Sequence, residues 1–322
     1  MHRLTFSRTV PRELVHRASV AEVFVTSLVE RGGQIAVGVQ LPRSHAFYRD
    51  SVTGHHDPVA FVEAGRQACL AVAHQCFRVP PEARFVLRRF ELRVHDPDGL
   101  AVTGAPCDAI LHCQVVRRFT HDEQLCGLHL RHRFEIDGSH VLTADFAFSW
   151  VLEHEWAAVR GTIEPLRTSP PPARCAAAVV GRSCARNVVI GPPHIDGVFA
   201  RAAVVVDTGH PTLFDHPVDH TPGMVLVEAV RQLATACAAV SANLGFGLVT
   251  ALRCRFSDFT ELGAEAICHC QLGAVQTVGD AREVDAWCWI DQSGSAVADA
   301  QLRMRFPVTA DAEQTDFAAR TC

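Results

Sequence analysis

The sequence has no run of 18 consecutive apolar residues, and its basic start has no apolar core of signal-peptide length. We therefore expect neither a membrane span nor secretion. Neither charge sign is in large excess, since the formal net charge is only -5 over 322 residues. Such a chain has no basic field that would gather nucleic acid or anionic lipid. We expect a cytoplasmic protein that binds neither nucleic acid nor membranes.

Metal-binding patterns are missing as well, although the chain has 18 His and 13 Cys. It contains no CxxC, no HExxH and no Cys/His pairs at zinc-finger spacing. His129 and His132 belong to the densest histidine group, but the strand-like pattern around them should send residues three apart to opposite faces. Most cysteines stand inside apolar runs, as buried thiols of a reducing compartment do. We expect no metal and no cofactor.

The clearest positive feature is an internal repeat. The segment DPVAFVEAGRQACLAVA, from Asp57 to Ala73, recurs as TPGMVLVEAVRQLATACAA, from Thr221 to Ala239. Glu63 then aligns with Glu228, and the spacing between them, the repeat offset, is close to half the chain. A period this long indicates a duplicated domain rather than a solenoid. Both segments are apolar around almost the whole circumference, which predicts two buried helices.

Strand-like runs surround each predicted helix. In the first half two runs precede the helix and four follow it, separated by the turn signals DPDG, THDE and DGS, and the second half has a similar layout. The stretch IEPLRTSPPPA between the halves is rich in Pro and has no pattern. We predict an N-terminal domain over residues 1–160, a linker over residues 161–176 and a C-terminal domain over residues 177–322.

One long helix followed by an antiparallel meander is typical of the hotdog fold, in which a sheet wraps around a central helix. The predicted fold class is therefore α+β, a tandem hotdog whose halves pair sheet edge to sheet edge as a pseudo-dimer. The protein could be a monomeric pseudo-dimer or a homodimer, with clefts between its halves. Gly65 is unfavourable inside the first helix and indicates a close approach to the backbone.

Each apolar helix carries a Glu, an Arg and a Gln. The Glu and Arg lie three residues apart and can pair on one helical face. A buried pair contributes little net stability, so ionisable groups of this kind in a cleft are functional candidates. The alternative is an architectural pair that fixes the helix register, which a duplication would also repeat. The residues are Glu63, Arg66 and Gln67 in the first half, and Glu228, Arg231 and Gln232 in the second.

The approach to the second helix is dense in titratable groups. Pro222 and Gly223 mark the helix start, where free N–H groups and the positive end of the dipole can polarise an acyl carbonyl. Turn formation and N-capping are the alternative role for the acidic residues upstream. The titratable residues are Asp215, His216, Asp219 and His220.

This approach resembles the helix entry of hydroxyacyl-ACP dehydratase hotdogs. Those enzymes need a His fourteen residues before the helix acid. Phe214 stands at that distance before Glu228, and Arg49 before Glu63, while His216 is displaced by two residues. The dehydratase interpretation therefore lacks its general base.

Three segments resemble the A-factor biosynthesis (AfsA) family of tandem-hotdog proteins: LVHRASVAEVFVTS, DPVAFVEAGRQ and HPVDHTPGMVLVEAVRQ. With the duplicated layout, the resemblance spans nearly the whole chain. It implies transfer of a β-ketoacyl group from an acyl carrier protein or CoA thioester to the hydroxyl of dihydroxyacetone phosphate. The ester would lead to a γ-butyrolactone or related autoregulator of an actinobacterium. The family's proposed catalytic Glu and Arg map onto Glu63 and Arg66, with Glu228 and Arg231 as counterparts.

We expect Glu63 or Glu228 to act as a general base. Arg66 or Arg231 would orient that carboxylate or hold the phosphate of the acceptor, although an Arg partner also lowers a Glu pKa and weakens the base. The alternatives are a hotdog thioesterase or dehydratase and a non-catalytic acyl-ligand-binding protein. The expected substrate-binding residues are Asp57, Gln67, Asp219, His220, Gly223 and Gln232.

Overall fold

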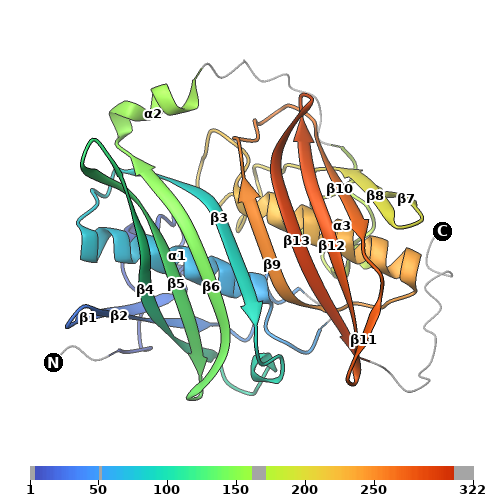
Figure 1. Cartoon of the computed structure of the whole chain (residues 1–322), viewed down its shortest axis with the longest axis horizontal. Coiled ribbons are helices and arrows are strands. Elements are labelled where there is room, and N and C mark those ends of the chain that lie inside the picture. Colours follow the sequence, from blue (N-terminus) through green and yellow to red (C-terminus); the bar gives the residue numbers. More distant parts are fainter. Residues whose placement is uncertain (1–3, 51–52, 162–171, 308–322) are drawn as a thin grey trace.

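One continuous antiparallel sheet carries two long helices on the same face (Figure 1). The computed structural model describes residues 4–50, 53–161 and 172–307. Each long helix packs against the strands of its own half, which confirms the predicted tandem hotdog. The predicted linker lies largely outside the described residues.

The elements of the first half are β1 (Val25–Arg31), β2 (Gln34–Leu41), α1 (Pro58–Phe77), β3 (Arg84–Val94), β4 (Cys107–His121), β5 (Gln124–Ile136), β6 (Ser139–Val151) and α2 (Glu153–Arg160). Those of the second half are β7 (His194–Asp196), β8 (Phe199–Ala203), α3 (Gly223–Ala242), β9 (Leu248–Phe256), β10 (Ala266–Leu272), β11 (Gln276–Val278), β12 (Ala281–Gln292) and β13 (Ser295–Pro307). Short 3-10 turns cover Arg12–Val15, Val20–Glu22, Asp98–Leu100, Ala177–Val180 and Ala185–Asn187.

The halves join through β3 and β9. The strand order is β1-β2-β4-β5-β6-β3-β9-β13-β12-β10-β8-β7, with β11 paired to β12. In the antiparallel β3–β9 pair, Leu92 lies opposite Leu252. The expected edge-to-edge pairing of the two sheets is therefore confirmed. It also brings the helices of both halves to one side of the molecule (Figure 1).

The two long helices begin differently. Asp57 caps α1, because its Oδ1 accepts a hydrogen bond from Val59 N at 2.9 Å. No side chain of the described residues caps α3, which follows Pro222. The helices end alike, at residues in the left-handed region, Arg78 after α1 and Asn243 after α3.

Both helices form the cores of their halves. The described side chains of α1 and α3 are mostly buried, as the apolar pattern predicts. By length and composition α3 alone among the described helices could cross a membrane. Since 67% of its most apolar window is buried inside the protein, α3 is the core helix of the second half.

The pleat of β5 separates the two histidines of the densest group, as predicted. His132 faces inward and is fully buried, with Nε2 3.2 Å from Cys69 Sγ and Nδ1 2.9 Å from Cys113 Sγ. His129 faces outward and contacts Asp145 at 3.0 Å. Burial lowers the pKa of His132 to about 4, so this imidazole is a neutral core residue.

Some elements differ from the sequence prediction. The strand predicted over RAAVVVDT stops at Ala203, because Val204 leaves the ladder and forms an isolated bridge with Ile190. The short strands β7 and β11 and the helix α2 were not predicted. The sequence of α2, EHEWAAVR, has too few apolar residues to show a helical period.

Gly65 marks a close approach, as its place in the helix suggested. A Cβ at this position would lie 2.6 Å from Cε2 of Phe146 on β6. We expect Gly65→Ala to lower the free energy of unfolding by about 1–3 kcal/mol, because the Phe146 ring must move out of its packing. Urea denaturation measures this change.

Gly104→Ala is the matched control, since a Cβ there meets no atom within 4 Å. It should change the free energy of unfolding by no more than about 0.5 kcal/mol. Alanine is otherwise the better helix former. A stabilised Gly65→Ala variant would therefore show that the helix has room to spare at Phe146.

Candidate active site

The carboxylate of Glu63 lies at the centre of a buried cluster on α1. Its side chain is 1% exposed. Arg66 donates from Nε to Oε2 at 2.8 Å and from Nη2 to Oε1 at 2.9 Å, and Gln67 Nε2 donates to Oε1 at 2.8 Å. Arg17 pairs with the same Oε1 from a segment before β1. The sequence pattern of the helix predicts Glu63 and Arg66 as site residues but gives no sign of Arg17.

Glu228 on α3 is held in the same way. Its side chain is fully buried and pairs with Arg231 on the same helix. Arg182 Nη2 donates to Glu228 Oε1 at 2.7 Å. Arg182 follows Arg17 at the same repeat offset that relates the two helices. Extending the repeat upstream to HRAS and GRSC would have revealed both arginines.

Gln67 and Gln232 connect the two long helices to neighbouring backbone by hydrogen bonds. Gln67 Oε1 accepts from Phe24 N at 2.8 Å, and its Nε2 donates to Glu22 O at 2.8 Å. Gln232 makes the equivalent bonds with residues 187–189. Both side chains are buried with their amide groups bonded to the protein, and neither lines the cavity of about 440 Å³ that opens between the halves. Their expected contact with substrate stays a prediction, and the bonds of the structure hold each helix to its neighbouring segment.

Each half holds the arginine-bearing segment of the other. Asp215 accepts from the backbone N–H groups of residues 18–19 at 2.6 and 3.0 Å. Asp50 accepts from those of residues 183–184 at 3.0 Å and 3.2 Å. Asp50 and Asp215 are themselves counterparts in the repeat, separated by the same offset. The exchange fixes the arginine segments at the interface between the halves.

A cavity of about 440 Å³ opens at this interface beside the Glu63 cluster. Its walls combine apolar side chains with polar and charged ones in about equal number. Arg66 is 23% exposed, and its Nη1 has no hydrogen bond among the described residues. Arg17 Nε is buried without a hydrogen-bond partner in the described chain. The polar and aromatic lining includes Arg17, Tyr48, Arg66, Phe85, Arg88, His216, His220 and Phe259.

The Glu228 cluster has no comparable opening within the described residues. Arg231 Nη1 binds both carboxylate oxygens of Asp57, at 2.6 and 2.7 Å, and the adjoining cavity is only about 40 Å³. Pro222 is the counterpart of Asp57 in the repeat, so Arg66 has no carboxylate at the equivalent position. The expected site residues thus divide between an open cluster and a closed one, and Asp57 belongs to the closed one.

The start of α3 forms part of the open cavity. Gly223 and Met224 line it, and no side chain in the described chain caps this helix. A substituent on Gly223 would lie 3.0 Å from Cζ of Phe256, so glycine keeps the helix start accessible. Free N–H groups at such a position can stabilise developing negative charge on an acyl oxygen. The structure places the expected residue Gly223 at the cavity.

Burial raises the pKa of Glu63, but ion pairing with Arg17 and Arg66 outweighs burial and leaves the pKa well below its usual range. The group therefore stays a carboxylate at neutral pH. It is already bonded to two guanidinium groups and does not line the cavity. Such a carboxylate is a poor proton acceptor and a good anchor for the arginines.

The structure pairs the other two expected residues, Asp219 and His220. His220 lines the cavity and Asp219 does not, but Asp219 bonds to the His220 ring, with Nδ1 and Oδ1 2.7 Å apart. His216 also lines the cavity. Burial lowers the pKa of His216, which favours a neutral ring.

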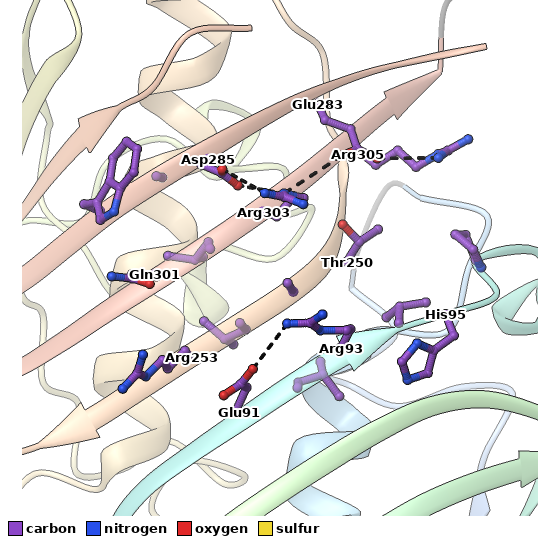
Figure 2. Close-up of a pocket in the computed structure, with 18 residues that line it drawn as sticks. Glu91, Arg93, His95, Thr250, Arg253, Glu283, Asp285, Gln301, Arg303 and Arg305 are labelled. Atoms are coloured by element: carbon purple, nitrogen blue, oxygen red, sulfur yellow. Dashed lines mark hydrogen bonds and ion pairs between the residues drawn. The ribbon is translucent and has the colours of Figure 1, made fainter. Parts of the chain in front are cut away.

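A second hollow, of about 520 Å³, lies on the outer face of the sheet where β3, β9, β13 and β12 run side by side (Figure 2). Its charged side chains pair with one another: Arg303 Nε donates to Asp285 Oδ1 at 2.8 Å, and Arg93 lies 3.6 Å from Glu91. These side chains are half-exposed, and exposed pairs of this kind contribute little energy. This hollow is a solvated sheet face rather than a candidate active site.

A cavity between two hotdog halves with one apolar side, bordered by arginines and an uncapped helix start, defines a double-hotdog protein suited to an acyl thioester. Within that class, the chain belongs to the A-factor biosynthesis hotdog family, whose model matches residues 2–151 and 164–307. The resemblance found in the sequence is confirmed.

Curated relatives carry one name, 2-oxo-3-(phosphooxy)propyl 3-oxoalkanoate synthase. The Streptomyces virginiae protein is 34% identical over 258 residues, covering 79% of this chain and 84% of its own. The Streptomyces coelicolor protein is 31% identical over 232 residues, covering 70% and 71%.

Among solved structures, a putative oleoyl thioesterase from Lactobacillus plantarum has a TM-score of 0.51 at 9% identity, over 86% of this chain and 99% of its own. A putative thioesterase II from Thermobifida fusca has a TM-score of 0.51 at 12% identity, over 87% and 96%. At such low identity these likenesses show the fold alone.

Proposed function

We propose that this protein transfers a β-ketoacyl group from a thioester to the hydroxyl of dihydroxyacetone phosphate. The product is a phosphorylated ester that leads to a butyrolactone-type autoregulator. One observation carries the proposal: of two related Arg–Glu–Arg clusters, the Glu63 cluster opens into a cavity that has an apolar side and a free helix start. The names of the Streptomyces relatives agree with this reaction.

The acyl group fits the apolar side of the cavity. Phe85, Leu87, Leu213 and Phe256 line that side, and they suit a hydrocarbon chain. The thioester carbonyl would lie at the start of α3, where the N–H groups near Gly223 stabilise the oxygen of the tetrahedral intermediate.

The acceptor phosphate fits the arginine side. Arg66 presents its unbonded Nη1 to the cavity, and Arg17 brings a buried Nε that has no partner in the described chain. Guanidinium groups bind phosphate with two parallel hydrogen bonds. Glu63 holds both arginines in place and keeps them charged. In this assignment Glu63 positions the arginines, and Glu228 with Arg231 stabilises the interface between the halves.

The thioester carrier would be an acyl carrier protein or CoA, and the reaction would take place in the cytoplasm. No cofactor is needed, because acyl transfer from a thioester requires only a base and stabilisation of the oxyanion. Both halves of one chain supply the cavity walls. A monomeric pseudo-dimer would therefore suffice, and a homodimer would contain two such sites.

The test is an incubation of the purified protein with a β-ketoacyl thioester, on acyl carrier protein or on CoA, and dihydroxyacetone phosphate. We expect mass spectrometry to detect the phosphorylated ester with at least one carrier. Release of the free acid at the same rate without the acceptor would instead indicate a thioesterase. Saturable binding without turnover would indicate an acyl-ligand-binding protein.

A further inference from the structure

We propose that His220, oriented by Asp219, is the general base that takes the proton from the acceptor hydroxyl. This inference rests on the proposed function and names the catalytic group that the two glutamates do not supply. Glu63 and Glu228 are each bound by two arginines, whereas His220 faces the open cavity.

The contact between Asp219 and His220 determines which ring nitrogen faces the substrate. His220 Nδ1 lies 2.7 Å from Asp219 Oδ1, and a carboxylate at this distance accepts the Nδ1 proton. The lone pair is then on Nε2, which has no hydrogen bond within the described part of the chain. A neutral imidazole held in this tautomer is the arrangement that activates the nucleophile in Ser-His-Asp enzymes.

Asp219 is itself fixed by α2. Its Oδ2 accepts from Trp156 Nε1 at 2.8 Å, and Arg160 Nη2 donates to its backbone oxygen at 3.2 Å. Arg160 also binds both carboxylate oxygens of Glu261, each at 2.8 Å. The carboxylate can therefore turn little, and this limits the orientations open to the imidazole.

Phe259 holds the imidazole ring from the side. The centroids of the two rings are 4.8 Å apart in an edge-to-face arrangement, and the guanidinium of Arg160 lies 4.5 Å from the Phe259 ring centre. His220 is thus supported by a hydrogen bond to Asp219 and by ring packing against Phe259. Side chains positioned this closely by a second layer of contacts are what catalysis by proton transfer requires.

The neighbouring histidines lack this support. His216 lines the same cavity but lies 3.4 Å from Asp215, whose carboxylate already accepts two backbone hydrogen bonds. His55 is the counterpart of His220 in the repeat, but Gly54 stands where Asp219 would be. Of these two counterpart positions, the one in the second half therefore carries the Asp–His pair, and this pair faces the open Glu63 cluster.

The chemical step balances with these groups alone. The hydroxyl oxygen of dihydroxyacetone phosphate attacks the thioester carbon as its proton passes to His220 Nε2. The tetrahedral intermediate then collapses, the C–S bond breaks, and His220 returns the proton to the departing sulfur. The products are the ester and the free thiol. The charged and titratable groups that surround the pair or line its cavity are Arg17, Arg66, Arg84, Arg88, Glu153, Arg160, Asp215, His216, Asp258 and Glu261.

The experiment measures transfer to dihydroxyacetone phosphate by the full-length His220→Gln variant. We expect kcat to fall by about 10²- to 10⁴-fold, since a general base contributes that factor. The acidic limb of the pH profile should disappear at the same time. For His220→Ala, added imidazole should restore part of the rate. A purely structural role of His220 would produce neither effect.

His55→Gln is the matched control and should keep the wild-type rate. Two results would overturn the assignment: a His220→Gln variant that works at the wild-type rate, or a slow variant that keeps the wild-type pH profile. If the wild-type protein makes no phosphorylated ester, the proposed function fails separately. Hydrolysis of the thioester by wild type and His220→Gln then tests the base, and equal rates reject it.

Discussion

Arg66→Met should lower kcat/KM for dihydroxyacetone phosphate by about 10²- to 10³-fold, as expected when the hydrogen-bonded cation of a charge pair is removed. The loss should appear mainly as a higher KM for the acceptor, because Arg66 is assigned to the phosphate. Steady-state kinetics with a fixed thioester concentration measures both constants. The fold should survive, since Glu63 keeps Arg17 and Gln67 as partners.

Dihydroxyacetone without its phosphate gives the sharpest comparison. Wild type should strongly prefer the phosphorylated acceptor, and Arg66→Met should lose most of that preference. Arg66→Lys keeps the charge without the planar fork and should recover part of it. If Arg66→Met slowed both acceptors equally, Arg66 would position the cluster and would not bind phosphate.

Arg231→Met should lower the free energy of unfolding by about 3–5 kcal/mol, because it leaves a buried carboxylate without its partner. Asp57 is 1% exposed and is bonded by Arg231 through both of its oxygens, whereas Glu228 keeps Arg182. Chemical denaturation measures the loss. The same substitution should change the KM for dihydroxyacetone phosphate little in the folded fraction.

Two further variants test whether the unpaired carboxylate of Asp57 causes this loss of stability. Arg303→Met breaks a half-exposed pair with Asp285 and should cost less than about 1 kcal/mol. Adding Asp57→Asn to Arg231→Met removes the unpaired charge and should recover a large part of the lost stability. A fully stable but inactive Arg231→Met variant would place the catalytic centre at the Glu228 cluster instead.

The fold could be predicted because its signals are strong and repeated. Two nearly all-apolar helices at a constant offset, each followed by alternating strands, leave few other architectures. The pleat also follows from the sequence, as His129 and His132 show by facing opposite sides. By contrast, α2 could not be predicted, because one short polar helix has no periodic pattern.

The candidate site was predicted only in part. The Glu–Arg pairs on the helices were found, because charges in an apolar helix stand out. Arg17 and Arg182 were missed, since each lies in a short irregular segment that reaches its Glu only through tertiary packing.

The sequence also does not show that the Glu63 cluster is open and the Glu228 cluster closed. It depends on Asp57, which looks like an ordinary N-cap in sequence and proves to bind Arg231 across the interface. No local pattern reports a contact between residues 174 positions apart.

The exchange of Asp50 and Asp215 has a consequence for how the two copies can diverge. Each copy supplies the Asp that anchors the arginine segment of the other. A substitution of one Asp therefore alters the cluster in the opposite copy. Neither copy can therefore drift freely while the other preserves the chemistry. Duplication has here produced two interdependent parts, in which the copy with the closed cluster both anchors the open cluster and supplies part of its cavity.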